Sequence, residues 1–187
     1  MTDTEIVTCA DADEWDRWLT AYGASRTAVW LRIARKGTGA VTVTVAEAGD
    51  VAICHGWIDS HRRRLDATHF LQRYSPRRPG SPWSRVNVER VAAFEAAGRM
   101  RPAGRAQVAA ARADGRWAAA YAPQRSAAVP DDLAAALAGD DRARVAYDAL
   151  GRGDRYALFL PLLKARTPEG RARALRRALA TLGAADG

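Results

Sequence analysis

Residues 57–75 have the sequence WIDSHRRRLDATHFLQRYS, and this stretch decides the fold class. Residues 57–64 and 68–75 have the alternating pattern of strands, and residues 65–67 form a short break between them. Two such runs with a short polar break predict a pair of antiparallel strands. Strand periodicity predicts one shared face in each run: Trp57, Asp59, His61 and Arg63 in the first, and Phe70, Gln72 and Tyr74 in the second.

On the N-terminal side, the sequence predicts two more strands and two capped helices. Residues 29–35 alternate as a strand does, and residues 41–43 predict a short one. Asp11 and Glu14 have the spacing of a helix start, and Thr44 with Glu47 has the pattern of a capping box. We therefore expect a helix from about residue 12 to 22 and another over residues 45–54.

On the C-terminal side, a loop over residues 76–82 leads into sequence that is helical in pattern throughout. The expected helices cover residues 82–97, 102–113, 131–138, 140–150, 154–166 (with Pro161 inside) and 168–183. The predicted fold is α+β, with a small, mostly antiparallel sheet in the N-terminal half packed on helices and an all-helical C-terminal half. We expect residues 1–125 to form the α+β core and residues 126–187 a helical extension packed on it as one globular unit.

Composition restricts the class of protein. The chain has 187 residues, and 48% of them are hydrophobic, which is enough for a real core. No apolar run approaches the ~20 residues of a membrane span. Two cysteines make no disulfide framework, and residues 1–5 are acidic rather than signal-like. We therefore expect a cytoplasmic protein.

Charge is concentrated in the middle third of the chain. The formal net charge is +8, and residues 61–128 hold 14 basic and 4 acidic side chains. Such a region attracts anions, or it is a soluble, self-repelling surface. No helix-turn-helix, zinc-finger or RNP pattern accompanies it. We therefore rank a nucleic-acid or anionic-surface binder third among the functions.

Five short blocks follow one another along the chain: WDRWL at residues 15–19, AICHGWIDS at 52–60, YSPRRPGSPWSRVN at 74–87, GRMRPAG at 98–104 and DGRW at 114–117. Together they resemble the YdeI/OmpD-associated family of bacteriocin-protection proteins, while the C-terminal tail fits more loosely. The resemblance implies a link to antimicrobial resistance and to an outer-membrane porin, but it implies no catalytic residues. His55 departs from the pattern because the family usually has an aromatic residue there.

His55 and Asp59 are the candidate catalytic pair. An imidazole with a carboxylate partner is the minimum for general acid–base chemistry. The alternative is that His55 is a tolerated substitution at a half-buried position. No nucleophile motif, phosphate loop or zinc-ligand spacing is present, so we expect no metal and no cofactor.

The candidate ligand-binding residues surround the sheet-to-helix transition. Trp57 and Trp83 would form the walls of a pocket or, alternatively, pack in the core. The remaining candidates are polar or aromatic neighbours in the same blocks: Arg73, Tyr74 and Asn87.

Three functions follow from these residues. The first is a resistance protein that sequesters a hydrophobic or amphipathic small molecule, such as an antimicrobial or secondary metabolite. The second is an enzyme of secondary metabolism that performs hydrolysis, ring opening or cyclisation with His55 as acid/base. The third is a protein that binds nucleic acid or another anionic surface. The sequence leaves open whether the protein forms a homodimer.

Overall fold

The computed structural model describes residues 5–183, so most of the acidic segment at residues 1–5 lies outside the described part. The chain divides into two compact units. Unit 1 comprises Met1–Trp83 and Asn87–Ala119, and unit 2 comprises Ser84–Val86 and Ala120–Gly187. The expected boundary at residue 125, and the packing of the two parts into one globule, stay predictions.

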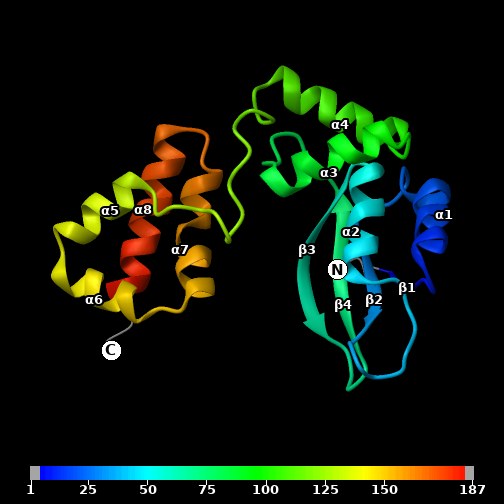
Figure 1. Ribbon diagram of the computed structural model, residues 1–187, viewed down its shortest axis with the longest axis horizontal. Helices are drawn as coiled ribbons and strands as arrows, with labels where there is room; N and C mark the ends of the chain where they lie inside the picture. Colours follow the sequence, from blue (N-terminus) through cyan, green and yellow to red (C-terminus); the bar gives the residue numbers. More distant parts are fainter. Residues whose placement is uncertain (1–4, 184–187) are drawn as a thin grey trace. The chain divides into compact units, whose positions relative to one another are not determined.

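A four-stranded sheet forms the centre of unit 1 (Figure 1). Its strands are β1 (Ile6–Thr8), β2 (Val29–Ala34), β3 (Trp57–Arg64) and β4 (His69–Pro76), in the spatial order β1-β2-β4-β3. The pair β1–β2 is parallel, whereas β2–β4 and β3–β4 are antiparallel. The mostly antiparallel sheet and the α+β class are thus confirmed.

One face of this sheet is buried under helices. Val29, Leu31 and Ile33 of β2 are buried, and the residues between them are only partly covered, as strand alternation requires. Opposite these residues, β4 contributes Tyr74, Gln72 and Phe70 in register. The apolar core of unit 1 therefore lies on this face.

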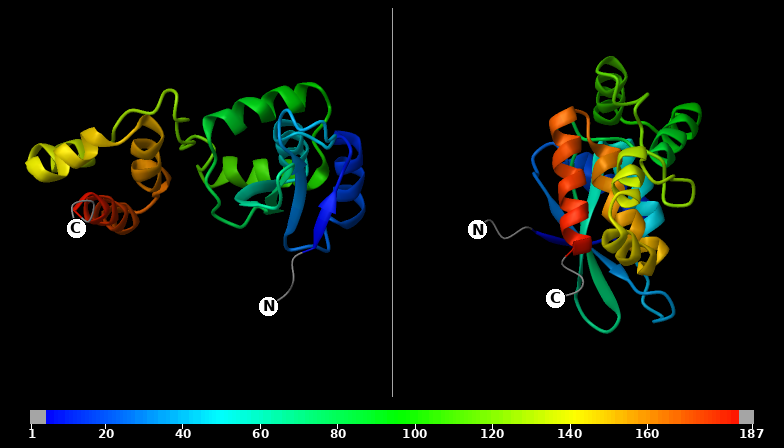
Figure 2. Two further views of the ribbon diagram at one scale, coloured as in Figure 1. Left: turned by 90° about the horizontal axis from the view of Figure 1, so that it is seen from below. Right: turned by 90° about the vertical axis from the view of Figure 1, so that its left-hand side faces the viewer.

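Four helices belong wholly or largely to unit 1: α1 (Ala12–Tyr22), α2 (Val45–Cys54), α3 (Arg85–Ala96) and α4 (Pro102–Ala113). Helices α1 and α4 both contact α2, and Arg90 of α3 pairs with Asp50 of α2 at 3.4 Å. Trp15 of α1 and Val51 of α2 belong to the same buried cluster as Val29 of β2, and the left view of Figure 2 draws α2 and α4 above the blue strands. These helices therefore gather on one face of the sheet.

Both predicted N-terminal caps form. The Asp11 side chain accepts a hydrogen bond from the backbone N–H of Glu14 at 2.8 Å. At the start of α2, Thr44 and Glu47 form the reciprocal capping box. These caps satisfy backbone N–H groups that the first turn of a helix leaves without a partner.

Two sequence expectations about the strands are wrong. Residues 41–43 form no strand, because this segment meets the sheet through isolated bonds, such as that from Ala34 N–H of β2 to Thr42 Oγ1 at 2.8 Å, instead of a ladder. The shared face expected along β3 is broken by a register shift between Asp59 and Arg62. After this bulge Arg62 pairs with Gln72 and Arg63 pairs with Leu71, so the two arginines point to opposite faces.

Unit 2 is helical. Its helices are α5 (Asp131–Ala138), α6 (Asp141–Ala149), α7 (Arg152–Lys164) and α8 (Pro168–Gly183). Leu133, Phe159, Leu162 and Leu182 are among the buried side chains of its core. Within residues 5–183, no helix has the length and apolar character to cross a membrane.

Candidate functional site

A cavity of about 560 Å³ opens in unit 1 where α1, the end of α2 and the start of α4 approach each other. Its volume lies in the range of small-molecule sites. Most of the lining is apolar, and four polar side chains interrupt it. The lining includes Leu19, Thr20, His55, Trp57, Arg101 and Gln107.

The polar end of this cavity is built around Asp16 of α1. His55 Nε2 lies 2.8 Å from Asp16 Oδ1. Arg101 forms an ion pair with the same carboxylate, and its Nε lies 3.3 Å from Oδ1. One carboxylate therefore holds both an imidazole and a guanidinium that line the cavity.

Asp16 is ionised in this arrangement. Burial by itself would raise the pKa of Asp16, but the hydrogen bonds with His55 and Arg101 outweigh it, so the pKa is lowered. An ionised carboxylate only accepts hydrogen bonds, so the proton of a neutral His55 ring sits on Nε2. The Nδ1 atom then keeps its lone pair and can accept a proton or a hydrogen bond.

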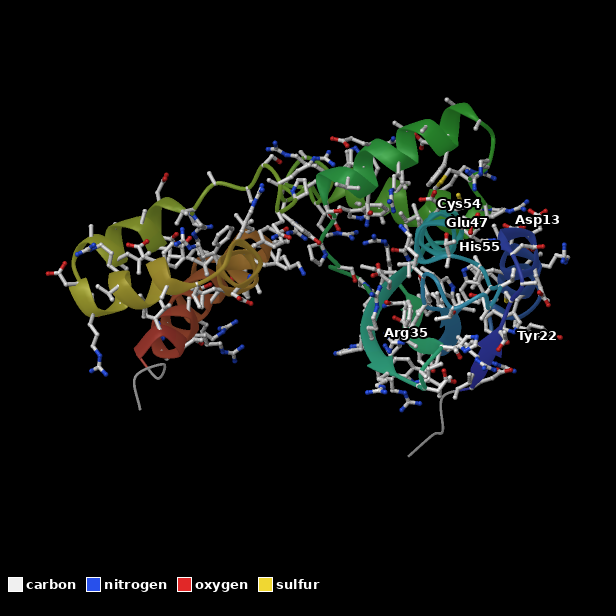
Figure 3. All side chains as sticks on the ribbon, turned by 60° about the horizontal axis from the view of Figure 1, so that its bottom comes forward. Asp13, Tyr22, Arg35, Glu47, Cys54 and His55 are labelled. Carbon is white, nitrogen blue, oxygen red and sulfur yellow. The ribbon has the colours of Figure 1, made fainter. Side chains whose placement is uncertain are left out.

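Close backbone contact between α2 and α4 brings these groups together. A Cβ atom at Gly104 would lie 2.0 Å from the Cys54 carbonyl oxygen, so only glycine allows this approach. The backbone N–H of Arg101 donates to the same carbonyl at 3.0 Å. Gly56 turns the chain with φ of 74° directly after His55. Figure 3 labels Cys54, the last residue of α2, and His55, which follows it.

Asp59 is not the partner of His55. The chain leaves Gly56 as a strand, which advances about 3.3 Å per residue and carries Asp59 away from the ring. Asp59 lies opposite Tyr74 in the ladder and is exposed. The imidazole–carboxylate pair that we expected therefore exists, but Asp16 supplies the carboxylate.

The two predicted tryptophan walls lie in different clusters. Trp57 lines the cavity and also packs against Trp15, with ring centroids 6.5 Å apart. Trp83 instead contacts Trp117 at 5.0 Å, and the guanidinium of Arg77 lies 3.8 Å from its ring centroid. Trp57 is thus both a wall of the cavity and a core residue, whereas Trp83 is outside the cavity lining.

The other predicted ligand-binding residues also lie outside this lining. Tyr74 is fully buried beside Trp15, at a centroid distance of 5.6 Å, and burial raises the pKa of its hydroxyl. Arg73 projects from the opposite face of the sheet and donates to Ser60 Oγ at 3.5 Å. Asn87 is half-buried near the start of α3.

Sequence reasoning missed Asp16 and Arg101. Asp16 lies 39 residues from His55 and 85 residues from Arg101, so no local spacing connects them. One available signal was the position of Asp16 between Trp15 and Leu19, which both face the core. The other was the location of Arg101 within the conspicuous block at residues 98–104.

The two cysteines are poor nucleophiles. Both are free and buried, and burial raises the pKa of Cys54 and raises that of Cys9 to about 12. Because the thiolate is the reactive form, neither side chain is suited to covalent catalysis near neutral pH. The chemistry available at the cavity therefore belongs to His55.

A larger groove, of about 840 Å³, lies between α7 and α8 of unit 2. Its lining is largely aliphatic, with Asp154, Lys164, Arg173 and Arg177 as the charged members. It contains no imidazole–carboxylate pair. The groove is therefore a second place where a ligand could be held, without the chemistry of the first.

Two family models match this chain. The model described as "Domain of unknown function (DUF8412)" matches residues 7–107, which is more than half of the sequence. The chain belongs to the DUF8412 family. The DUF8412 match contains every residue of the cavity lining, including Gln107 at its end. The model described as "Bacteriocin-protection, YdeI or OmpD-Associated" matches residues 126–184. Neither a curated protein nor a solved structure matches.

The YdeI/OmpD-associated resemblance is thus supported on a different part of the chain from the one we expected. The similarity lies in the C-terminal tail, whereas four of the five blocks fall within the DUF8412 domain and the block at residues 114–117 falls outside both matches. Trp, Gly and Pro in these blocks occupy turns, caps and core positions that many domains share, so they discriminate families weakly. The match to a bacteriocin-protection domain hints at a protective role.

Proposed function

We propose that the DUF8412 domain binds a small hydrophobic or amphipathic molecule in the cavity beside His55, and that the protein protects its cell by sequestering it. The cavity of about 560 Å³ carries this proposal. Leu19 and Trp57 offer apolar surface, while His55 Nδ1 and the Gln107 carboxamide offer hydrogen bonds. Such a mixture is typical of small-molecule sites.

Two matched substitutions test the location. Ala24 lines the cavity and Ala157 lines the groove of unit 2, and both are exposed. Tryptophan at either position would obstruct the adjoining space with little effect on a core. Each variant is incubated with a metabolite extract from the host, and retained compounds are identified by mass. We expect Ala24→Trp to lose the compound that wild type and Ala157→Trp retain. The opposite pattern would move the site to unit 2 and refute the proposal.

The His55–Asp16 pair favours a second candidate, an enzyme that performs acid–base chemistry on the bound molecule. Asp16 fixes the ring and leaves Nδ1 to take a proton, as a general base does. His55→Phe separates the two functions because it keeps an aromatic ring and removes the titratable nitrogen. For sequestration, both proteins should retain the compound unchanged. For catalysis, wild type should convert the compound and His55→Phe should only bind it.

A further inference from the structure

The β3–β4 hairpin carries exposed positive charge that the cavity does not use. Residues 59–64 of β3 are all exposed, and Arg62, Arg63 and Arg64 follow one another there. Across residues 29–36 and 57–76, seven Arg or Lys side chains accompany only two carboxylates, those of Asp59 and Asp66. The hairpin turn lies at the lower end of the sheet in Figure 1, and Figure 3 places Arg35 away from Cys54 and His55.

Arg62 and Arg63 are held in place without being neutralised. The Arg62 guanidinium lies 4.4 Å from the Phe70 ring centroid, and its Nε donates to Gln72 at 3.0 Å. The Arg63 guanidinium lies 4.5 Å from the ring centroid of Trp30. Among residues 5–183, no carboxylate lies within ion-pair distance of Arg62, Arg63 or Arg64. Ordered cations without counter-charges lose little side-chain freedom when an anion binds.

Alternation along β3 distributes the charge over both faces of the strand, and the bulge decides which arginine lies on which face. Arg62 pairs with Gln72, on the face that carries the core of unit 1. Arg63 pairs with Leu71, on the opposite face. A polyanion that lies along the open β3 edge would therefore meet guanidinium groups on either side of that strand.

Edge protection is the simplest alternative explanation. β3 is an edge strand of the sheet, and charged side chains on an edge discourage pairing with other chains. That reason does not extend to Arg73 on β4, since this strand lies inside the sheet, whereas Arg32 on β2 has Asp66 as an ion-pair partner at 3.9 Å. The basic surface is therefore wider than edge protection needs.

We propose that the exposed β3 edge of the β3–β4 hairpin binds double-stranded nucleic acid through its phosphate backbone. A duplex presents a continuous row of phosphates, and an edge strand can lie along it without entering a groove. Guanidinium groups on both faces of this edge strand can reach successive phosphates. The rings of Trp30 and Phe70 lie under Arg63 and Arg62, so they are not free to stack on unpaired bases. This covering favours a duplex over a single strand.

The test measures binding of the full chain to a labelled DNA duplex of mixed sequence over a series of salt concentrations. The variant R62Q/R63Q/R64Q removes three charges from the hairpin. The control R173Q/R176Q/R177Q removes three exposed charges from α8 and so matches the change in net charge. A third variant, R62K/R63K/R64K, restores the charge without the guanidinium. Thermal unfolding confirms that each variant folds.

We expect the hairpin variant to reduce the slope of log affinity against log salt by about 2.7, at roughly 0.9 per lost phosphate contact. Its affinity at low salt should fall on the order of 10²-fold. The α8 control should stay near wild type, and the lysine variant should recover most of the slope. A chain that binds no duplex, or equal losses in both glutamine variants, would refute the proposal. Tighter binding to single-stranded DNA, or to phosphatidylglycerol vesicles, would do so as well.

Discussion

Gly104→Ala tests the contact on which the candidate site depends. A Cβ atom at this position would lie 2.0 Å from the oxygen and 2.8 Å from the carbon of the Cys54 carbonyl. Both are backbone atoms, so no side chain can rotate to make room. An ordinary contact begins at 3.4 Å, and α4 must therefore move from α2 by about 1.4 Å.

The expected cost follows from three terms. Overpacking of this kind costs about 1–3 kcal/mol. Displacement also weakens the hydrogen bond from Arg101 N–H to the Cys54 carbonyl, which contributes about 1 kcal/mol. The higher helix propensity of alanine relative to glycine offsets about 1 kcal/mol of this cost. The free energy of unfolding should therefore fall by about 1–3 kcal/mol.

Gly49→Ala is the matched control. Gly49 also lies inside a helix, but the nearest atom to its added Cβ is Arg90 Nη1 at 3.8 Å, an ordinary contact. Alanine should therefore stabilise the fold there by about 0.5–1 kcal/mol. Urea unfolding followed by tryptophan fluorescence suits both variants, because all six tryptophans lie in unit 1. If Gly104→Ala unfolds at or above the urea midpoint of wild type, α4 does not approach α2 as closely as described, and the reasoning is refuted.

Three further predictions concern charges and caps. Burial opposes the shift, but the pKa of Asp16 is lowered in the folded state. Ionised Asp16 therefore stabilises the fold above its unfolded pKa, and this contribution is lost as the pH falls through the pKa of the folded state. Asp16→Asn should therefore lose less stability than wild type between neutral pH and about pH 3, and an equal loss in denaturant titrations would contradict this. Thr44→Ala removes the capping box of α2 and should cost about 1 kcal/mol in thermal unfolding, whereas Thr44→Ser should retain most of it. The pKa of Asp66 is lowered to about 2, first by the backbone N–H of Thr68 and then by its hydroxyl. Thr68→Val should raise that pKa toward 3.8 in an NMR titration, and an unchanged value would show that the hydroxyl has no effect.

Much of the fold could be predicted from local sequence. The bounds of α2, α4 and α5 match the expected ranges, because a cap residue or a proline marks each start. The hairpin β3–β4 was predicted from alternation and a short polar break. The segment at residues 41–43 was not, because valines and threonines favour extended backbone whether or not a ladder is available to them.

The candidate site was only half predictable. His55 and Trp57 were chosen for their chemistry, and both line the cavity. The carboxylate was assigned to Asp59 because it is near in sequence, whereas α1 supplies it from 39 residues away. The bulge in β3 also reversed the face of Arg63, which no alternation pattern could reveal.

The sequence by itself determined the helices, the caps of α1 and α2 and the strands β2, β3 and β4, because these depend on hydrogen bonds and side-chain periodicity within a few residues. Tertiary structure alone decided that Asp16, His55 and Arg101 meet at one cavity. Their meeting depends on the approach of α4 to α2, which one glycine permits and long-range packing stabilises. Contacts of this kind depend on which surfaces become buried together, and the local spacing of residues in the sequence does not specify those surfaces.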